Sequence, residues 1–266
     1  MKEHLQRLLE QADNNLGRLS LAREYLQARI LESLQDSGAF TRWVFLGGTA
    51  LRFLYSMPRF SEDLDFSLRD AEAEAGFKEA LLRTKRALSK EGYDLEVRVR
   101  DQKNIASAMF GFPGLPYELG VSLRRAQKLS VKVELDTNPP SGAGITTTLV
   151  RRHVTLNLCH HDRPSLLAGK VHAVLSRRWT KGRDLFDLAW YLADPNWPPP
   201  NLELLNAALS QTGWNGDALT PDNWRHAVRT RIEQMDWERA RQDVRPFLER
   251  ERDLELVTPE ALRGLL

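Results

Sequence analysis

Cysteine is almost absent from this sequence, because Cys159 is the only one among 266 residues. A single cysteine excludes a disulfide within the chain, and such usage is typical of proteins in a reducing cytoplasm. Long apolar runs are also missing, since no stretch approaches the roughly 20 residues that a membrane-spanning helix needs. Residues 1–15 are amphipathic and charged, without the apolar core of a secretory signal. We therefore expect a soluble cytoplasmic protein with no membrane association, and we expect Cys159 in its core.

The chain also has little net charge, only +2 at pH 7 from 38 Lys+Arg against 36 Asp+Glu. This balance does not indicate a nucleic-acid-binding protein as a whole. The charge is uneven, however, because residues 151–184 contain eight Lys or Arg and only two Asp or Glu. A local basic surface can attract a polyanion whatever the total charge. This region is therefore a candidate contact for a polyanion.

The most informative segment, residues 46–66, contains two glycines and a threonine directly after Leu46. Residues 43–46 before it are apolar and β-prone, which predicts a buried strand. Gly47 and Gly48 would let the backbone turn tightly and approach a ligand closely. We expect Thr49 to cap the helix that follows. The backbone N–H groups at the start of such a helix would favour an anion such as a phosphate.

Two aspartates follow at the far end of the same segment. Met57 and Pro58 should end the helix, and residues 63–66 are typical of a second strand. Alternation along a strand would place Asp63 and Asp65 on one face. Neighbouring carboxylates repel each other unless a hard cation such as Mg²⁺ binds between them. Taken singly, the glycines are most simply a turn and the aspartates a solvated face, but their order and spacing together favour a site.

Predicted helices and strands alternate irregularly along the chain. We expect helices over residues 2–36 with a break near 14–17, over 71–91 and from 164 onward, and strands over 93–101, 105–110, 129–136 and 145–158. Asp194, Pro195 and residues 198–200 mark a boundary before a C-terminal helical part.

Polar residues in two later segments are further candidates for a functional site. Alternation in the strand over 129–136 would place Lys132, Glu134 and Asp136 on one face, which a half-buried strand explains equally well. Lys170 lies at the edge of a helical apolar stripe, where a lysine can simply extend its amine to water. Asp184 and Asp187 are neighbours in a first helical turn, where acids complement the helix dipole.

Three segments together resemble one protein family. GGTALRFLYSMPRFSEDLDFSL, residues 47–68, resembles the first motif of the nucleotidyltransferase superfamily, and most of all the AbiEii/AbiGii-type nucleotidyltransferases. Many members of that family are toxins of bacterial toxin–antitoxin and phage-abortive systems. VKVELDTNPP, residues 131–140, and LLAGKVHAVLSRRWTKGRDLFDLAWYL, residues 166–192, fit the same family. The resemblance spans residues 43–192, and the chain beyond it matches only as a helical region.

The resemblance implies a fold and a division of the chain. The fold would be of the α+β class, with a nucleotidyltransferase-type mixed β-sheet flanked by helices and a C-terminal helical bundle. Residues 1–160 would form the nucleotidyltransferase core with its N-terminal helices, and residues 161–266 a helical part. The first helices of that part, residues 164–194, would complete the active site.

The resemblance also implies roles for individual residues. Asp63, Asp65 and a third carboxylate would bind Mg²⁺, two ions in all, with Glu134 preferred for the third position and Asp136 as the alternative. Lys170 would bind the triphosphate or act in catalysis, and Asp184 would be the functional aspartate in preference to Asp187. Arg177, two turns beyond Lys170 on nearly the same helical face, could reach the same phosphates. The full set expected to bind the nucleotide comprises Gly47, Gly48, Thr49, Arg52, Arg59, Ser61, Lys170 and Arg177.

The activity implied is transfer of a nucleoside monophosphate from an NTP to an acceptor hydroxyl, with release of pyrophosphate. Acceptors within the family include tRNA 3′ ends, which favours RNA here, and a cognate antitoxin is an expected protein partner. Phage defence is the expected setting. Two alternatives are a nucleotidyltransferase acting on a small molecule such as an aminoglycoside, and a nucleotide-binding module without catalysis.

Overall fold

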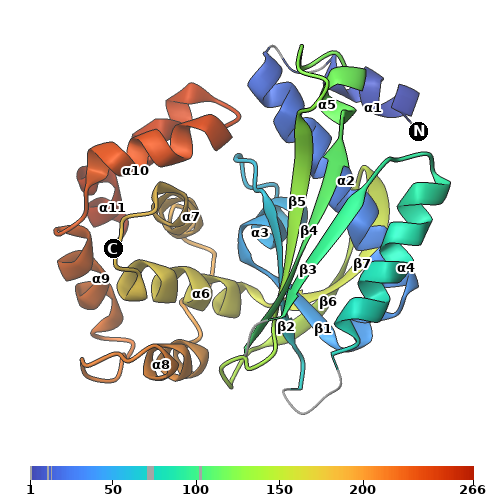
Figure 1. The fold of residues 1–266 in the computed structure, drawn as a ribbon. Helices are drawn as coiled ribbons and strands as arrows, with labels where there is room; N and C mark the ends of the chain where they lie inside the picture. The colour runs from blue at the N-terminus through green and yellow to red at the C-terminus, as the bar shows by residue number, and fades with distance from the viewer. Residues whose placement is uncertain (1, 11, 13, 71–74, 102–103) are drawn as a thin grey trace. The chain divides into compact units, whose positions relative to one another are not determined.

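The structure is a computed structural model that describes residues 2–10, 12, 14–70, 75–101 and 104–266 (Figure 1). The chain divides into two compact units. Unit 1 consists of Met1–Tyr55, Phe60–Pro139 and Thr147–His160, and unit 2 of Ser56–Arg59, Pro140–Thr146 and His161–Leu266. Two short segments that precede residue 160 in the sequence, at 56–59 and 140–146, therefore belong to unit 2.

A seven-stranded mixed sheet with the strand order β3-β4-β5-β2-β1-β7-β6 is the centre of unit 1. Strand β2 pairs in parallel with β5, and β1 with β7, whereas β1–β2, β3–β4 and β4–β5 are antiparallel pairs. The strands are β1 Trp43–Leu46, β2 Asp63–Leu68, β3 Glu96–Asp101, β4 Ile105–Pro113, β5 Lys128–Asp136, β6 Ile145–Arg152 and β7 Val154–His161. Cys159 is buried in β7, as predicted.

The helices of unit 1 are α1 Lys2–Leu9, α2 Asn15–Asp36, α3 Gly47–Tyr55, α4 Phe77–Lys90 and the short α5 Leu115–Glu118, with a 3₁₀ turn at Ala39–Thr41. The predicted break in the N-terminal helix is confirmed, and Asn14 caps α2 by accepting a hydrogen bond from the Gly17 N–H. Helix α4 begins later than the predicted residue 71, and residues 71–74 lie outside the described part of the chain.

The two faces of the sheet differ because residues alternate along each strand. Trp43 and Phe45 on β1 pair with Leu68 and Phe66 on β2, and these apolar side chains share the core face. Phe77 of α4 contacts Trp43, with 5.5 Å between the ring centroids, so α4 covers this face. Helix α2 contacts both α4 and β5 and lies along the sheet with α4 (Figure 1). The opposite face carries the polar residues of β2 and β5.

One predicted strand is wrong. Residues 145–158 were expected to form a single strand, but β6 and β7 are neighbouring strands separated at His153. His153 has a φ of 61°, a left-handed conformation that non-glycine residues seldom adopt. Its ring nitrogen bonds Glu24 Oε1 at 2.8 Å, which holds the residue in this turn. No glycine or proline marks the turn in the sequence.

Unit 2 is a helical bundle, and together with the mixed sheet it confirms the predicted α+β class. Its helices are α6 Arg163–Ser176, α7 Gly182–Leu192, α8 Leu202–Gln211, α9 Trp224–Ile232, α10 Trp237–Val244 and α11 Pro259–Leu265, with 3₁₀ turns at Arg245–Phe247 and Glu251–Leu256. Helix α6 contacts α7, α8 and α9, while α7 contacts α10 and α11. Asp162 caps α6 by accepting a hydrogen bond from the Ser165 N–H.

Within the part of the chain that the structure describes, no helix combines the length and apolar character needed to cross a membrane.

Candidate functional site

The predicted carboxylate pair begins strand β2, and a glycine turn lies against it. Strand β1 ends at Leu46, opposite Asp65, and Gly47 follows with a φ of 82°. A Cβ atom at Gly47 would lie 2.5 Å from Oδ2 of Asp65. The turn therefore requires glycine both for its backbone conformation and for its closeness to the carboxylate.

Thr49 does not cap the helix, contrary to the sequence prediction. Helix α3 begins at Gly47, so Thr49 already lies within its first turn. The Thr49 side chain is fully buried, and its hydroxyl donates a hydrogen bond to the backbone carbonyl of Asp63. Because this bond joins the start of α3 to the start of β2, it fixes the glycine turn relative to the aspartates.

Strand register brings a third carboxylate beside the pair. In the parallel β2–β5 ladder, Asp65 is the partner of Glu134 and Asp63 is the partner of Lys132. Asp63, Asp65, Lys132 and Glu134 are all half-buried and share the polar face of the sheet. Asp136, the alternative third carboxylate, pairs instead with Ser67 and lies one step further along. Of the two candidates, Glu134 is therefore the one directly opposite Asp65.

A lysine within this group affects its electrostatics. Lys132 Nζ lies 2.7 Å from Oε1 of Glu134. Burial alone would lower the pKa of Lys132, but the carboxylates of Glu134, Asp63 and Asp65 outweigh it and raise that pKa. Lys132 therefore stays charged and offsets part of the repulsion among the three acids. Alternation along the strand predicted that Lys132 lies on this face, but no sequence pattern indicated a role for it.

The donor set of this face suits a hard divalent cation, because carboxylate oxygens are the protein ligands that Mg²⁺ prefers. Asp63, Asp65 and Glu134 would be the ligands. With the side chains as they stand, Lys132 contacts Glu134, and the described residues contain no group of three or more His, Cys, Asp or Glu gathered closely enough to hold a metal. Binding a cation here would require Glu134 to exchange its contact with Lys132 for one with the metal.

Arg52, which was expected to bind the nucleotide, points into the interior of unit 1. Its side chain is 2% exposed and forms an ion pair with Glu24 of α2, which is 3% exposed. Arg152 and His153 also contact Glu24. Burial would raise the pKa of Glu24, but the hydrogen bond from His153 and the charges of Arg52 and Arg152 lower it to about 2. Arg52 is thus part of a satisfied buried ion cluster, where it stabilises the packing of α3 against α2.

Two further predicted residues lie close together in sequence but in different units. Ser61 is half-buried in unit 1, where its carbonyl accepts a hydrogen bond of 3.1 Å from the Gln27 side chain. Arg59 belongs to unit 2, and its guanidinium binds both carboxylate oxygens of Asp187 at 2.6 Å. Arg59 also forms an isolated β-bridge with Leu248. The segment at 56–59 is therefore anchored on unit 2.

Asp187 is the centre of an ion-pair cluster in unit 2 that also includes Lys170 and Asp184. Lys170 Nζ lies 2.7 Å from Asp187 Oδ2 and 3.4 Å from Asp184 Oδ1. Arg177 Nε lies 3.1 Å from Asp184 Oδ2. Asp187 is completely buried, whereas Asp184 keeps a small exposed fraction. Lys170 and Arg177 thus converge on Asp184, although not in the predicted way, because α6 ends at Ser176 and Arg177 is extended.

Both members of the Lys170–Asp187 pair are charged. Burial lowers the pKa of Lys170, but the nearby Asp187 and Asp184 carboxylates more than reverse this effect and raise it. Burial raises the pKa of Asp187, but Arg59 and Lys170 outweigh it and lower that pKa. The cations predicted to bind phosphate therefore already have carboxylate partners. A phosphate oxygen would have to replace a carboxylate oxygen on Lys170.

The basic segment at 151–183 is less basic in three dimensions than in sequence. Arg152 pairs with Glu24, Lys170 with Asp187 and Arg177 with Asp184, while Arg183 Nε lies 3.9 Å from Asp243. Four of the eight cations therefore have acidic partners, and three of these partners, Glu24, Asp187 and Asp243, lie outside the segment whose charges were counted. Sequence composition alone could not reveal these pairs, because each partner comes from another element.

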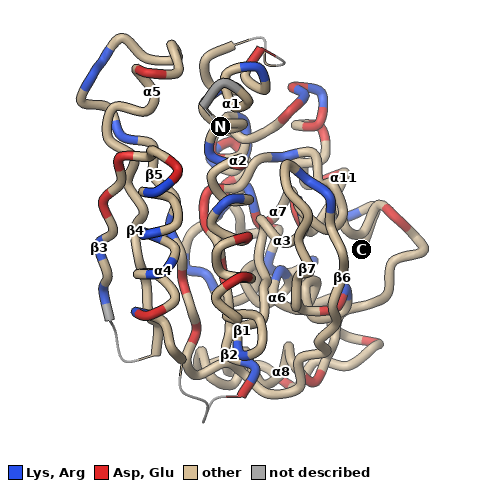
Figure 2. The backbone as a smooth tube through the Cα atoms, turned by 90° about the vertical axis from the view of Figure 1, so that its right-hand side faces the viewer, with Lys and Arg blue, Asp and Glu red and all other residues tan. Residues whose placement is uncertain are grey.

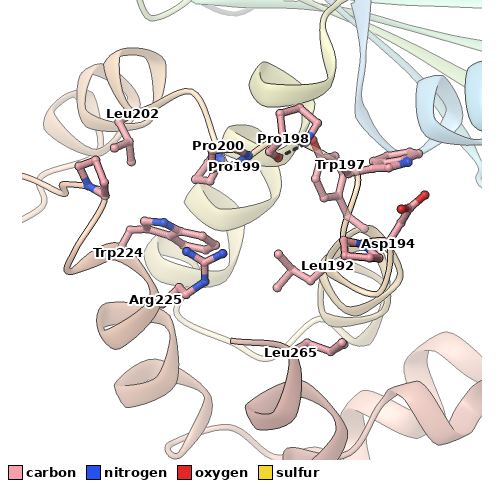
Figure 3. A pocket seen from close by; sticks show the side chains of 13 residues that line it. Leu192, Asp194, Trp197, Pro198, Pro199, Pro200, Leu202, Trp224, Arg225 and Leu265 are labelled. Carbon is pink, nitrogen blue, oxygen red and sulfur yellow. Dashed lines mark hydrogen bonds between the residues drawn. The ribbon is translucent and has the colours of Figure 1, made fainter.

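A pocket of about 410 Å³ lies in unit 2, at the C-terminal end of α7 (Figure 3). Leu192 of α7, Trp224 of α9 and Leu265 of α11 line it together with residues 198–200. The Tyr191 hydroxyl donates a hydrogen bond of 3.0 Å to the Pro198 carbonyl, which fixes the proline run across the pocket. None of the predicted site residues is among the described residues that line it.

Comparison with known proteins identifies the family. A family model described as nucleotidyl transferase AbiEii toxin of a type IV toxin–antitoxin system matches residues 29–259. A search of curated proteins found no match. Among solved structures, a candidate nucleotidyltransferase from Helicobacter pylori is 20% identical with a TM-score of 0.48, covering 93% of this chain and 97% of that one. JHP933 from Helicobacter pylori is 19% identical with a TM-score of 0.47, covering 92% and 94%.

The family match extends over most of the chain and includes both the β2 carboxylate pair and the Lys170 cluster. The resemblance found in the sequence is therefore confirmed, as is the predicted enzyme class. The chain belongs to the AbiEii family of nucleotidyl transferase toxins, and it is a nucleotidyltransferase.

Proposed function

We propose that the chain transfers a nucleoside monophosphate from an NTP to the 3′ hydroxyl of an RNA acceptor, such as a tRNA end, in a Mg²⁺-dependent reaction. The observation that carries the proposal is the arrangement of Asp63, Asp65 and Glu134 on one face of the sheet, with the Gly47 turn against Asp65. Mg²⁺ bound by these carboxylates would supply positive charge to the attacking and leaving oxygens of the transfer.

The residues around the carboxylates hold the reactants in place. Backbone N–H groups in the first turn of α3, at Gly48 and beyond, favour a phosphate oxygen, because they are not all used within the helix. The bond from Thr49 to the Asp63 carbonyl keeps these donors at a fixed position relative to the aspartates. Glu134, whose Oε1 lies 2.7 Å from Lys132 Nζ, is proposed to accept the proton of the acceptor hydroxyl.

The roles proposed for residues of unit 2 rest on the family resemblance. Lys170 is proposed to contact the triphosphate after exchanging a carboxylate partner for a phosphate oxygen, with Asp184 as the more exposed of its two partners. Arg59 and Arg177 are proposed to add positive charge for the phosphates. A cognate antitoxin, a cytoplasmic location and a part in phage defence complete the proposal.

Replacing the carboxylates one at a time tests this proposal. Asp63→Asn and Glu134→Gln should each abolish transfer of label from an α-³²P-NTP to RNA, because each removes a charge from the proposed cation site while keeping the size of the side chain. Asp136→Asn should retain most of the activity, since Asp136 pairs with Ser67 rather than with a member of the site.

The matched controls are thermal unfolding and circular dichroism of all three variants, which should resemble those of the wild type. Full activity in Asp63→Asn would overturn the site assignment. Loss of activity in Asp136→Asn with retention in Glu134→Gln would exchange the roles of these two residues.

A further inference from the structure

The polar face of the sheet extends beyond the catalytic carboxylates to an edge strand that carries two arginines. Residues paired across a ladder share a face, so the register can be followed from strand to strand. Asp65 pairs with Glu134, Glu134 with Ser107 of β4, and Ser107 with Arg100 of β3. This row ends at the sheet edge, because β3 is the outermost strand.

A second row runs beside the first. Asp63 pairs with Lys132, Lys132 with Met109 of β4, and Met109 with Arg98 of β3. Each catalytic aspartate is therefore aligned with one arginine on the edge strand. With neighbouring strands about 4.8 Å apart, the three steps place Arg98 and Arg100 roughly 14 Å from the aspartates along the sheet.

This part of the face is open to solvent. The side chain of Arg98 is 77% exposed, and Arg100 is exposed as well. Met109 and Ile105 on β4 are exposed apolar residues of the same face, 38% and 43% exposed. Helices α2 and α4 pack on the other face, where Ala106, Ala108 and Phe110 are buried. Figure 2 marks both basic and acidic positions along β3.

One acidic residue, Glu96, partly neutralises the positive charge of this edge. Glu96 lies 2.8 Å from Lys128 Nζ and 3.4 Å from Arg98 Nη2, and all three side chains are well exposed. Such exposed pairs contribute little and exchange readily with a competing anion. With Arg100, Arg98 and Lys128 against Glu96, this edge keeps a positive excess.

We propose that Arg98 and Arg100 bind the phosphate backbone of the RNA acceptor, whose 3′ end crosses β4 and β5 to reach Asp63 and Asp65 on β2. This inference rests on the proposed function and names the acceptor surface of the same site. A guanidinium can bind a phosphate through two hydrogen bonds, and an exposed, flexible one does so without a sequence requirement. Met109 and Ile105 offer apolar contact to nucleotides between the arginines and the carboxylates.

The test compares three double variants in binding a short single-stranded RNA that ends in a 3′-deoxy nucleotide and so cannot be extended. The double variant Arg98→Gln/Arg100→Gln should raise the dissociation constant for RNA about tenfold. It should also reduce the slope of log affinity against log salt by about 1.4, because each lost phosphate contact on a single strand removes about 0.7. Arg98→Lys with Arg100→Lys should restore most of the affinity. In transfer assays, the Arg98→Gln/Arg100→Gln variant should have a higher KM for RNA and an unchanged KM for NTP.

The matched control removes two charges from the outer surface of α4, on the other side of the sheet. Lys85→Gln with Arg86→Gln should bind RNA like the wild type. Equal weakening in this control, or an unchanged salt slope in the Arg98/Arg100 variant, would overturn the inference. The inference would also be overturned if the Arg98→Gln/Arg100→Gln variant bound RNA normally but no longer bound a polyglutamate peptide. This face would then bind an acidic protein rather than RNA. A wild type that binds RNA through these arginines without labelling it would instead refute the proposed acceptor and leave the surface standing.

Discussion

At the scale of single residues, Gly47 lies in the turn against Asp65, one of the proposed cation ligands. Its φ of 82° would cost an alanine roughly 1–2 kcal/mol, and the alanine methyl would also meet Asp65 Oδ2. Gly38 has a similar φ of 76°, but nothing lies within 4 Å of its would-be Cβ. Comparing alanine substitutions at the two positions therefore distinguishes the effect of backbone strain from the effect of displacing the Asp65 carboxylate.

Gly47→Ala and Gly38→Ala are expected to lose similar stability, measured as the free energy of unfolding in urea. Only Gly47→Ala should lose activity, by about a hundredfold, because a small displacement of a catalytic group can have that effect. If Gly38→Ala reduced transfer as strongly as Gly47→Ala, the loss would come from strain in the fold, and the role of Gly47 beside Asp65 would be refuted.

The sequence predicted which residues share a face better than it predicted their partners. Period-two alternation placed Asp63 with Asp65 and Lys132 with Glu134, because a strand leaves little freedom in the direction of its side chains. It could not show that Arg52 pairs with Glu24, 28 residues away, or that Lys170 is enclosed by Asp184 and Asp187. Such pairs depend on how helices pack, which no local pattern records.

At the scale of elements, the helix packing of unit 2 depends on a glycine at the start of α7. A Cβ at Gly182 would lie 1.8 Å from the backbone carbonyl oxygen of Ala240 in α10. Helices α7 and α10 can approach this closely only because that side chain is missing. Helix α7 also carries Asp184 and Asp187, so its position sets the geometry of the ion-pair cluster.

Gly182→Ala should therefore destabilise the protein by about 1–3 kcal/mol, the usual cost of overpacking, because backbone atoms must move. Gly169→Ala in α6 is the matched change, since nothing lies within 4 Å of its Cβ position. That variant should gain about 0.5–1 kcal/mol, because alanine favours the helix more than glycine does. Thermal unfolding of both variants provides the measurement, and a neutral Gly182→Ala would contradict the close approach of α7 and α10.

Most elements followed from the sequence, and the exceptions have local causes. Strand β1 and the extended pair β3–β4 matched their apolar patterns, and Pro164 correctly marked the start of α6. Thr49 was misjudged because α3 begins directly after β1, with Gly47 and Gly48 as its first residues. The β6–β7 turn was missed because His153, rather than a glycine, adopts the left-handed conformation, supported by its bond to Glu24.

At the scale of the whole molecule, the family match includes candidate site residues of both units. Asp63 and Asp65 belong to unit 1, while Lys170, Asp184 and Asp187 belong to unit 2. Arg59 stands only four residues before Asp63 in the sequence, yet it is bound to Asp187 within unit 2. The loop between α3 and β2 therefore contains residues of both units. The distribution of residues between units could not be read from the sequence, which shows only their order.

Nucleotidyl transfer at the Asp63–Asp65–Glu134 face can be tested by following the fate of the NTP phosphates. The wild-type protein is incubated with Mg²⁺, total RNA and each NTP in turn, labelled either at the α- or at the γ-phosphate. We expect that RNA gains label from α-labelled NTP only, that γ-label leaves in pyrophosphate, and that Asp63→Asn yields neither product. Transfer of γ-label to RNA would show phosphoryl rather than nucleotidyl transfer, and α-label transfer by Asp63→Asn at the wild-type rate would place the chemistry elsewhere. Either result would refute nucleotidyl transfer at this face.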